Sequence, residues 1–171
     1  YLLADRTFRE SWEVQRRGAF GVSEMTARAF PAGLIVEILC RHNHDMAAAV
    51  DEIFQTLQAT GFRYFDFPDM PPDADDLGLL LRLFPYSRQQ ASHRDILHTP
   101  LRWLGENVRQ SGEIPVWFTR QTGFDDSDGQ SVALWGQTCV TVEANLLLGL
   151  LDYDATGHQA LIEKSACSIL E

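Results

Sequence analysis

Apolar residues recur along most of the chain at the three- and four-residue spacing typical of helices that face a core. The pattern predicts helices over residues 23–40, 46–59, 73–84, 93–109 and 138–151, and a sixth that begins at Thr156. No stretch shows the alternation of apolar and polar residues that predicts a strand. Residues 112–135 form a long irregular segment. We therefore expect an all-α fold in a single domain that comprises residues 1–171.

Residues with special backbone properties mark the ends of several of these helices. Ser23 and Asp45 are suited to cap helix starts. Gly61 is suited to end a helix, because glycine readily adopts the left-handed backbone found there. Pro31 and Pro100 fall inside predicted helices, and each should kink or split its helix because proline lacks a backbone N–H.

Two kinds of helix alternate in this pattern. Residues 77–84 and 146–151 are apolar nearly all round, which predicts helices buried on every side. Residues 46–59 and 94–110 carry a single apolar stripe, which predicts helices in an outer layer. Inner and outer helices that alternate, in pairs repeated at roughly 20 to 50 residues, are typical of an α/α toroid.

The composition indicates which partners the protein is expected to bind and in which cellular compartment it is expected to occur. The chain has 14 Lys and Arg against 24 Asp and Glu, a formal net charge of −10. Nucleic acid is therefore excluded as an expected partner, because phosphate binding needs clustered cations. Cys40, Cys139 and Cys167 are far apart and lack metal or redox spacing, so we interpret them as reduced thiols of a cytoplasmic protein.

Other polar clusters do not match a known kind of site. His42 and His44 are two residues apart and have no third ligand near them in the sequence. Residues 125–129 resemble part of a calcium loop, but the first and twelfth ligand positions are occupied by Phe124 and Trp135. We therefore expect neither a metal site nor a cofactor.

One stretch, PPDADDLGLLLRL at residues 71–83, places three acids where an apolar helix begins. One interpretation is structural: Asp73 caps the helix, Asp76 completes a capping box, and the helix dipole keeps the acids, Asp75 included, ionised. The other is catalytic, since crowding carboxylates in a site without water raises the pKa of one of them. Such an acid donates a proton at neutral pH. The sequence leaves both interpretations open.

Three motifs resemble those of the terpenoid cyclase and prenyltransferase-like α/α toroids. PPDADDLGLLLRL is similar to a Pro-Asp-x-Asp-Asp-Thr-Ala helix start, with Leu77-Gly78 in place of Thr-Ala. CVTVEANLLLGL at residues 139–150 resembles an inner helix of that superfamily. QSGEIPVW at residues 110–117 resembles its Gln…Gly…Trp repeat, which joins one helical hairpin to the next. The resemblance implies a toroid of which six helices form about half.

The resemblance to class II terpene cyclases also implies an enzymatic function. Asp75 would protonate a C=C bond or an epoxide of a linear isoprenoid, and Asp73 and Asp76 would tune its acidity. The resulting cation needs a chamber with aromatic walls and without water. The residues expected to supply the walls and polar contacts of this chamber are Phe62, Tyr64, Phe65, Phe67, Trp117, Phe118, Trp135, Glu143 and Asn145.

The partners implied by the resemblance are a hydrophobic isoprenoid-type ligand, a membrane surface, and a second copy or a further domain that completes the toroid. The alternative is a toroid module without catalysis that binds a hydrophobic ligand, a peptide or a partner protein. An enzyme needs a closed apolar cavity that the acids face. A binding module would have Asp73 and Asp76 bonded to backbone amides above an open groove.

Overall fold

The computed structural model describes residues 14–17, 24–67, 70–120, 122 and 137–170, and these residues are mostly helical. The helices are α1 (Ala29–Arg41), α2 (Ala47–Ala59), α3 (Ala74–Leu83), α4 (Gln90–Asn107), α6 (Val140–Asp154) and α7 (Gln159–Leu170), with a short 3-10 helix, η2 (Phe84–Tyr86). Strands β1 (Val14–Arg17) and β2 (Glu24–Ala27) form an antiparallel pair. The predicted helical class is confirmed, with a small sheet in addition.

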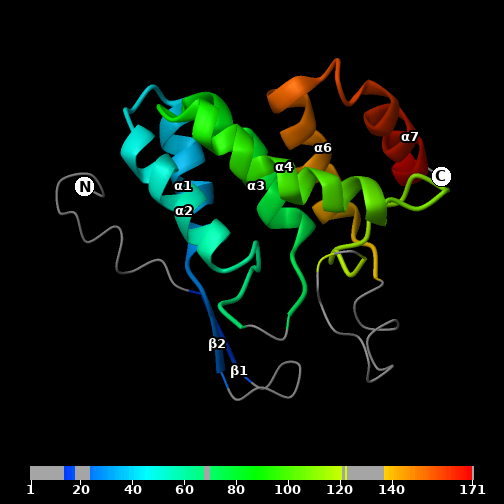
Figure 1. Ribbon diagram of the computed structural model, residues 1–171, viewed down its shortest axis with the longest axis horizontal. Helices are drawn as coiled ribbons and strands as arrows, with labels where there is room; N and C mark the ends of the chain where they lie inside the picture. The colour runs from blue at the N-terminus through cyan, green and yellow to red at the C-terminus, as the bar shows by residue number, and fades with distance from the viewer. Residues whose placement is uncertain (1–13, 18–23, 68–69, 121, 123–136, 171) are drawn as a thin grey trace.

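The helices follow one another as three pairs set side by side: α1 with α2, α3 with α4, and α6 with α7 (Figure 1). Helix α3 lies at the centre, because it contacts α1, α2, α4 and α6. Nine of its ten residues are buried, and only Asp75 retains intermediate exposure. The prediction that residues 77–84 are buried on every side is therefore confirmed.

The prediction for residues 146–151 is wrong in part. Leu146, Leu147 and Leu150 are buried in α6, but Leu148 and Leu151 are 55% and 48% exposed. Helix α6 packs against α3 on one side and against α7 on another. Its remaining face, which carries Leu148 and Leu151, is uncovered by the residues that the structure describes.

Two glycines allow α3 and α6 to approach each other closely. A Cβ atom added at Gly149 of α6 would lie 2.5 Å from the carbonyl oxygen of Gly78 in α3. A Cβ atom added at Gly78 would lie 2.9 Å from Cα of Leu146. Real side chains do not tolerate such distances, so the backbones of these two helices touch without intervening side chains.

The predicted helix over residues 23–40 is wrong at its beginning, where β2 stands instead. Helix α1 begins at Ala29, which places Pro31 in its first turn. Backbone N–H groups in that turn have no partner within the helix, so proline fits there without a kink. Pro100 lies inside α4, which continues through it to Asn107, so the helix is not split.

Two hydrophobic clusters form the core. The buried residues of the larger cluster come mainly from α1, α2, α3, α4 and α6, and partly buried residues of α7 pack against them. Gly61, at φ +68°, follows the end of α2 as expected. The smaller cluster holds Met25, Ala27, Phe65 and Met70, with Tyr64, Phe67 and Trp117 packed against it. Within the described residues, no helix combines the length and the apolar character needed to cross a membrane.

Candidate functional site

Asp73 caps the N-terminus of α3, as one interpretation of the sequence predicts. Its backbone is extended, and its Oδ1 accepts a hydrogen bond from the backbone N–H of Asp75 at 2.6 Å. The capping box is not completed, however. The backbone N–H of Asp73 donates to the carbonyl of Phe62 at 2.8 Å, so it is not available to the side chain of Asp76.

Asp76 is wholly buried at the start of α3. Its side chain has 0% exposure, and neither of its carboxyl oxygens has a hydrogen-bond partner in the part of the chain that the structure describes. A buried carboxylate without partners is strongly disfavoured relative to the neutral acid. Burial, together with the charges of Asp73 and Asp75, raises the pKa of Asp76 well above its ordinary value.

The protonation state of Asp73 depends on the balance between burial and the hydrogen bonds of the helix cap. Burial raises the pKa of Asp73 to about 7, although the backbone N–H groups of Asp75 and Asp76 act in the opposite direction. The expectation that the helix dipole keeps all three acids ionised is therefore wrong for the buried pair, Asp73 and Asp76. Desolvation exceeds the stabilisation that the helix start provides.

Asp75 has different surroundings. The side-chain amide of Asn145 in α6 donates to its carboxylate and, at 3.1 Å, to its backbone carbonyl. Burial raises the pKa of Asp75, while the hydrogen bond from Asn145 and the charge of Arg82 lower it. Arg82 is itself buried and donates to Glu37 at 2.9 Å, which ties α3 to α1.

A pocket of about 320 Å³ lies between β1, the loop before α3 and the segment after α4. The residues that line it are Val14, Gln15, Arg16, Tyr64, Phe65, Met70, Asp73 and Trp117. Asp73 is the one acid among them, and it is only 5% exposed. The pocket thus offers a ligand the carboxyl group of Asp73, three aromatic rings, aliphatic surface, and the polar side chains of Gln15 and Arg16, the second of which is a cation.

The backbone of residues 114–118 runs beside the start of α3 and holds one wall of this pocket. Asp73 and Trp117 form an antiparallel bridge, with hydrogen bonds of 2.8 Å from Ala74 N to Val116 O and from Phe118 N to Pro72 O. A buried carboxylate from α6, that of Glu143, accepts a hydrogen bond from the N–H of Ile114. The segment is therefore joined to the start of α3 through the backbones of both, and to α6 through the side chain of Glu143.

The remaining residues expected at the site have varied positions. Tyr64, Phe65 and Trp117 line the pocket, whereas Phe67 belongs to the smaller hydrophobic cluster outside the lining. Phe62 and Phe118 are buried in the larger cluster. Glu143 accepts a hydrogen bond from Ile114 in the pocket wall, and Asn145 donates to Asp75. Neither residue lines the pocket. Trp135 and the 125–129 loop lie outside the described residues.

No pattern in the sequence indicated that β1 contributes Val14, Gln15 and Arg16 to the pocket. The strand is four residues long and exposed throughout, so it lacks the apolar alternation by which a strand is recognised. Its register with β2, in which Arg16 pairs with Met25, brings it beside the smaller cluster.

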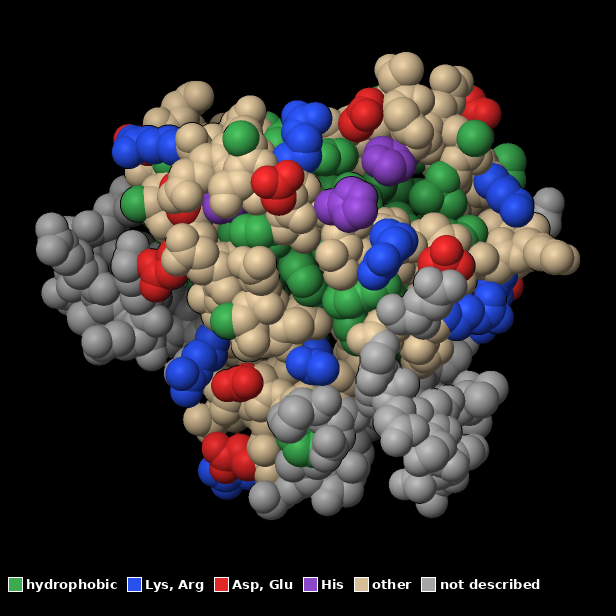
Figure 2. All heavy atoms as spheres, viewed as in Figure 1, with side chains coloured by type: hydrophobic (Ala, Val, Ile, Leu, Met, Phe, Trp, Pro, Cys, Tyr) green, Lys and Arg blue, Asp and Glu red, His purple; other side chains and the backbone are tan. Residues whose placement is uncertain are grey.

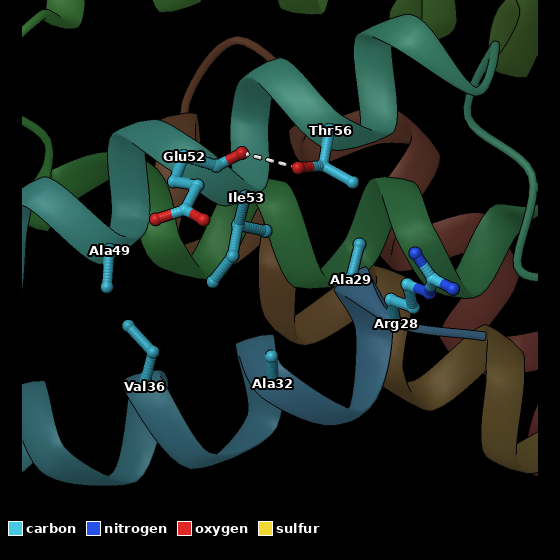
Figure 3. A pocket seen from close by; sticks show the side chains of 8 residues that line it. All are labelled: Arg28, Ala29, Ala32, Val36, Ala49, Glu52, Ile53 and Thr56. Carbon is cyan, nitrogen blue, oxygen red and sulfur yellow. Dashed lines mark hydrogen bonds between the residues drawn. The ribbon is translucent and has the colours of Figure 1, made fainter. Parts of the chain in front are cut away.

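A second pocket, of about 260 Å³, lies between α1 and α2 (Figure 3). Ala29, Ala32 and Ala49 leave this space because their side chains are short, and Val36 and Ile53 complete its apolar part. The Thr56 hydroxyl donates to the Glu52 carbonyl at 2.9 Å within the helix itself. This pocket holds no cluster of groups that could carry out a reaction.

On the face seen in Figure 2, the charged side chains of the described residues do not gather into one large patch of a single sign. In Figure 2, acidic and basic side chains are dispersed over the face that is viewed, without a continuous basic area among the described residues. Within the same part of the chain, no three His, Cys, Asp or Glu side chains come together to hold a metal ion.

Comparisons with family models, with curated proteins and with solved structures gave no match to this chain. The class of site is therefore defined by its geometry: a buried pair of carboxyl groups, one of which faces an aromatic pocket.

Proposed function

We propose that this protein is an acid catalyst of the class II terpene cyclase type, which protonates a C=C bond or an epoxide of a linear isoprenoid and so starts its cyclisation. The observation that carries this proposal is the position of Asp73. Its carboxyl group is almost completely buried and lines a pocket whose other walls include Tyr64, Phe65 and Trp117.

The chemistry requires an acid that keeps its proton at neutral pH and a chamber that tolerates a cation. Burial, which raises the pKa of Asp73 to about 7, keeps a substantial fraction of these carboxyl groups protonated at neutral pH, as the first requirement demands. The π electrons of the substrate take the proton, a carbocation forms, and a second C=C bond of the same chain attacks it to close a ring. The cyclic cation then loses a proton to water from a carbon next to the charge, a C=C bond forms again, and water returns a proton to the carboxylate of Asp73. The faces of the aromatic rings stabilise the positive charge while it moves.

Asp73 is a better-supported donor than Asp75, to which the family resemblance gives this role. Asp73 lines the pocket and Asp75 does not. Asp75 also accepts the amide hydrogen bond of Asn145 and lies in the field of Arg82, and both favour its ionised form. We assign Asp75 the role of a neighbouring negative charge, which raises the pKa of Asp73 and Asp76.

The architecture that we propose is about half of an α/α toroid, closed by a second copy or a further domain. The side of α1 and α6 that would face the missing half is apolar: Ile38 is 57% exposed and Leu148 is 55% exposed. The ion pair between Arg41 and Asp152, at 2.8 Å, holds these helices together about one turn further along each. Exposed apolar surface of this kind supports an interface.

The size of the pocket limits the substrate. A volume of about 320 Å³ lies near the lower end of the range of roughly 300–1,000 Å³ that is usual for small-molecule sites. The pocket by itself accommodates a short isoprenoid or the reacting end of a longer one. A long substrate would extend toward the proposed second half.

The second candidate function is a toroid module that binds a hydrophobic ligand without catalysis. One observation favours it: the Asp73 carboxylate accepts a backbone N–H, as a capping residue does. The surroundings of Asp76 argue against this function. A carboxyl group that served only as a cap would have a backbone partner, and none is found among the described residues.

Product formation separates these two functions. The purified protein is incubated with linear prenyl diphosphates of increasing length and with squalene, and cyclic products are identified by mass spectrometry. We expect Asp73→Asn to lower turnover by about a hundredfold or more, because Asn keeps the shape and the cap but cannot donate a proton to an alkene. Asp95→Asn, an exposed change in α4, is the control.

Each outcome of this assay has a clear meaning. Loss of turnover in Asp75→Asn alone would make Asp75 the donor, as the family resemblance implies. Binding of an isoprenoid without any product would favour the non-catalytic module. Turnover that survives both substitutions would contradict acid catalysis by this cluster.

A further inference from the structure

The second pocket, between α1 and α2, is a site that the proposed reaction does not use. Among the described residues, it shares none of its lining with the pocket of Asp73. Its volume of about 260 Å³ lies just below the range of roughly 300–1,000 Å³ that is usual for sites of drug-sized ligands. The space therefore fits a smaller molecule.

The middle of this pocket is aliphatic. Val36 of α1 and Ala49 and Ile53 of α2 are buried there. Ala29 and Ala32 lie along the same wall as Val36, and their short side chains leave the space between the two helices open (Figure 3). The described residues that line the pocket include no aromatic ring. An unbranched aliphatic chain fits such walls, whereas a peptide bond buried against them would lose its hydrogen bonds to water.

Opposite charges flank the aliphatic middle. Arg28 and Glu52 are the two charged side chains among the described residues that line the pocket, and both reach solvent. In Figure 3, Arg28 lies at one end of the pocket beside Ala29, and Glu52 lies on the far side of Ile53. The remaining lining hydroxyl, that of Thr56, already donates to the carbonyl of Glu52 at 2.9 Å. Arg28 is thus the group suited to an anion, and Glu52 the group suited to a cation.

These two charges distinguish between small aliphatic ligands. A simple carboxylate would be attracted by Arg28 and repelled by Glu52, and a simple amine would meet the reverse. A molecule with one charge of each sign, separated by a methylene chain, complements both side chains. We propose that this pocket binds an aliphatic ω-amino acid, with its carboxylate at Arg28, its ammonium group at Glu52 and its chain along Val36, Ala49 and Ile53.

The test uses 6-aminohexanoate, in which a methylene chain separates the two charges. Hexanoate and hexylamine, each of which lacks one of these charges, are the matched probes. Binding is followed by NMR of the protein labelled with carbon-13 in its alanine methyl groups. Ala29, Ala32 and Ala49 report on the pocket, and Ala144, exposed in α6, is the control signal.

We expect 6-aminohexanoate to shift the methyl signals of Ala29, Ala32 and Ala49 and to leave that of Ala144 unchanged. Hexanoate and hexylamine should each bind roughly three- to tenfold more weakly. Each loses one hydrogen bond between charged groups, and contact with solvent reduces the strength of that bond.

Substitutions of the two charged residues separate the ends of the ligand. In Arg28→Gln, 6-aminohexanoate should bind no better than hexylamine, because its carboxylate has lost its partner. In Glu52→Gln it should bind no better than hexanoate. Arg102→Gln and Glu106→Gln, at exposed positions in α4, are the matched controls and should retain the preference for 6-aminohexanoate.

A third kind of variant removes the space and keeps the charges. Ala32→Leu should abolish binding because the larger side chain fills the pocket, whereas Ala144→Leu should not. The proposal would be overturned if none of the probes shifted the signals of the pocket alanines, or if all three bound the unmodified protein equally well. None of these measurements depends on whether cyclic products form.

Discussion

The side-chain amide of Asn145 in α6 donates to both the backbone carbonyl and the carboxylate of Asp75 in the first turn of α3. One side chain therefore holds the acidic turn in position and opposes the rise that burial causes in the pKa of Asp75. The helices are already close at this end, since Gly78 and Leu146 touch through their backbones. The hydrogen bonds from the Asn145 amide add to that backbone contact.

Replacement of Asn145 by Leu should affect both stability and titration. We expect the free energy of unfolding to fall by about 0.5–1.5 kcal/mol, because the acceptors on half-buried Asp75 lose the hydrogen bonds from half-buried Asn145. The pKa of Asp75 should rise, since the hydrogen bond from Asn145 lowers it. Urea unfolding and carbon-13 NMR titration of the carboxyl group measure the two effects. Thr141→Val, at an exposed position in α6, is the control. An unaltered pKa of Asp75 in Asn145→Leu would contradict the hydrogen bond between Asn145 and the Asp75 carboxylate.

The close approach of α3 and α6 predicts opposite results for two Gly-to-Ala substitutions. Gly149→Ala should destabilise the fold by about 1–3 kcal/mol, because its Cβ would overlap the carbonyl of Gly78 and force the helices apart. Gly105→Ala in α4 meets no atom within 4 Å and should stabilise the fold by about 0.4–1 kcal/mol. Thermal unfolding of both variants tests this, and a Gly149→Ala protein as stable as the Gly105→Ala protein would show that α3 and α6 do not touch.

Asp73 should make stability depend on pH in a defined direction. Its pKa is about 7 in the folded protein against 3.8 for an unperturbed carboxyl. Its contribution to stability is therefore fully present below about pH 3.8 and is lost as the pH rises to about 7. Asp73→Asn has no carboxyl group to titrate at this position and does not lose this contribution. The difference in free energy of unfolding, variant minus unmodified protein, should therefore grow as the pH rises from about 3.8 to about 7.

A second variant, Asp73→Ala, separates the contribution of the helix cap to stability from the contribution of the Asp73 titration. Asn and Asp are comparable N-caps, whereas Asp73→Ala removes the cap and should be about 1 kcal/mol less stable than Asp73→Asn at every pH. Denaturant unfolding at a series of pH values measures all three proteins. Parallel pH profiles for the Asn variant and the unmodified protein would contradict the raised pKa.

His93 predicts a dependence on pH of the opposite sign. Its ring is 1% exposed, stacks on Phe54 at 4.0 Å and lies 2.7 Å from the Ser87 hydroxyl through Nδ1. Burial lowers the pKa of His93 below its ordinary 6.5, although the charge of Asp51 acts in the opposite direction. The contribution of His93 is thus present above pH 6.5 and is lost as the pH falls through its folded pKa.

The variant His93→Gln should remove this acid-side loss of stability, and the matched change His98→Gln should not, because His98 is exposed in the same helix. Unfolding experiments at mildly acidic and at neutral pH compare the two variants. Equal acid sensitivity of His93→Gln and the unmodified protein would show that another group is responsible.

Local patterns predicted the features that depend on neighbours in the sequence. The apolar run of residues 77–84 predicted a buried helix, and Asp73 was recognised as its cap. Leu148 and Leu151 were expected to be buried because an apolar helix is ordinarily covered on all sides, but the described chain supplies neighbours on only part of α6. Periodicity measures the composition of a helix face and not what lies against it.

The pocket itself could not be predicted, because it depends on contacts between distant segments. Arg16, Tyr64 and Trp117 meet through the pairing of β1 with β2 and the bridge from Trp117 to Asp73. Glu143 and Asn145 were noticed as polar residues in an apolar helix, which is the signal that buried polar groups give. Only the structure shows that Asn145 supports the acidic turn through Asp75 and that Glu143 supports the 114–118 segment through Ile114.

The most direct test of the central claim is the fate of solvent hydrogen during the reaction. Cyclisation started by an acid in this pocket should place a single non-exchangeable deuterium on a carbon of the product when the protein is incubated in D₂O with an isoprenoid that carries no epoxide, so that the proton is added to a C=C bond. Asp73→Asn should give neither the product nor the label. A cyclic product that carries no deuterium would contradict the account, because the reaction would then begin by loss of a leaving group and not by protonation.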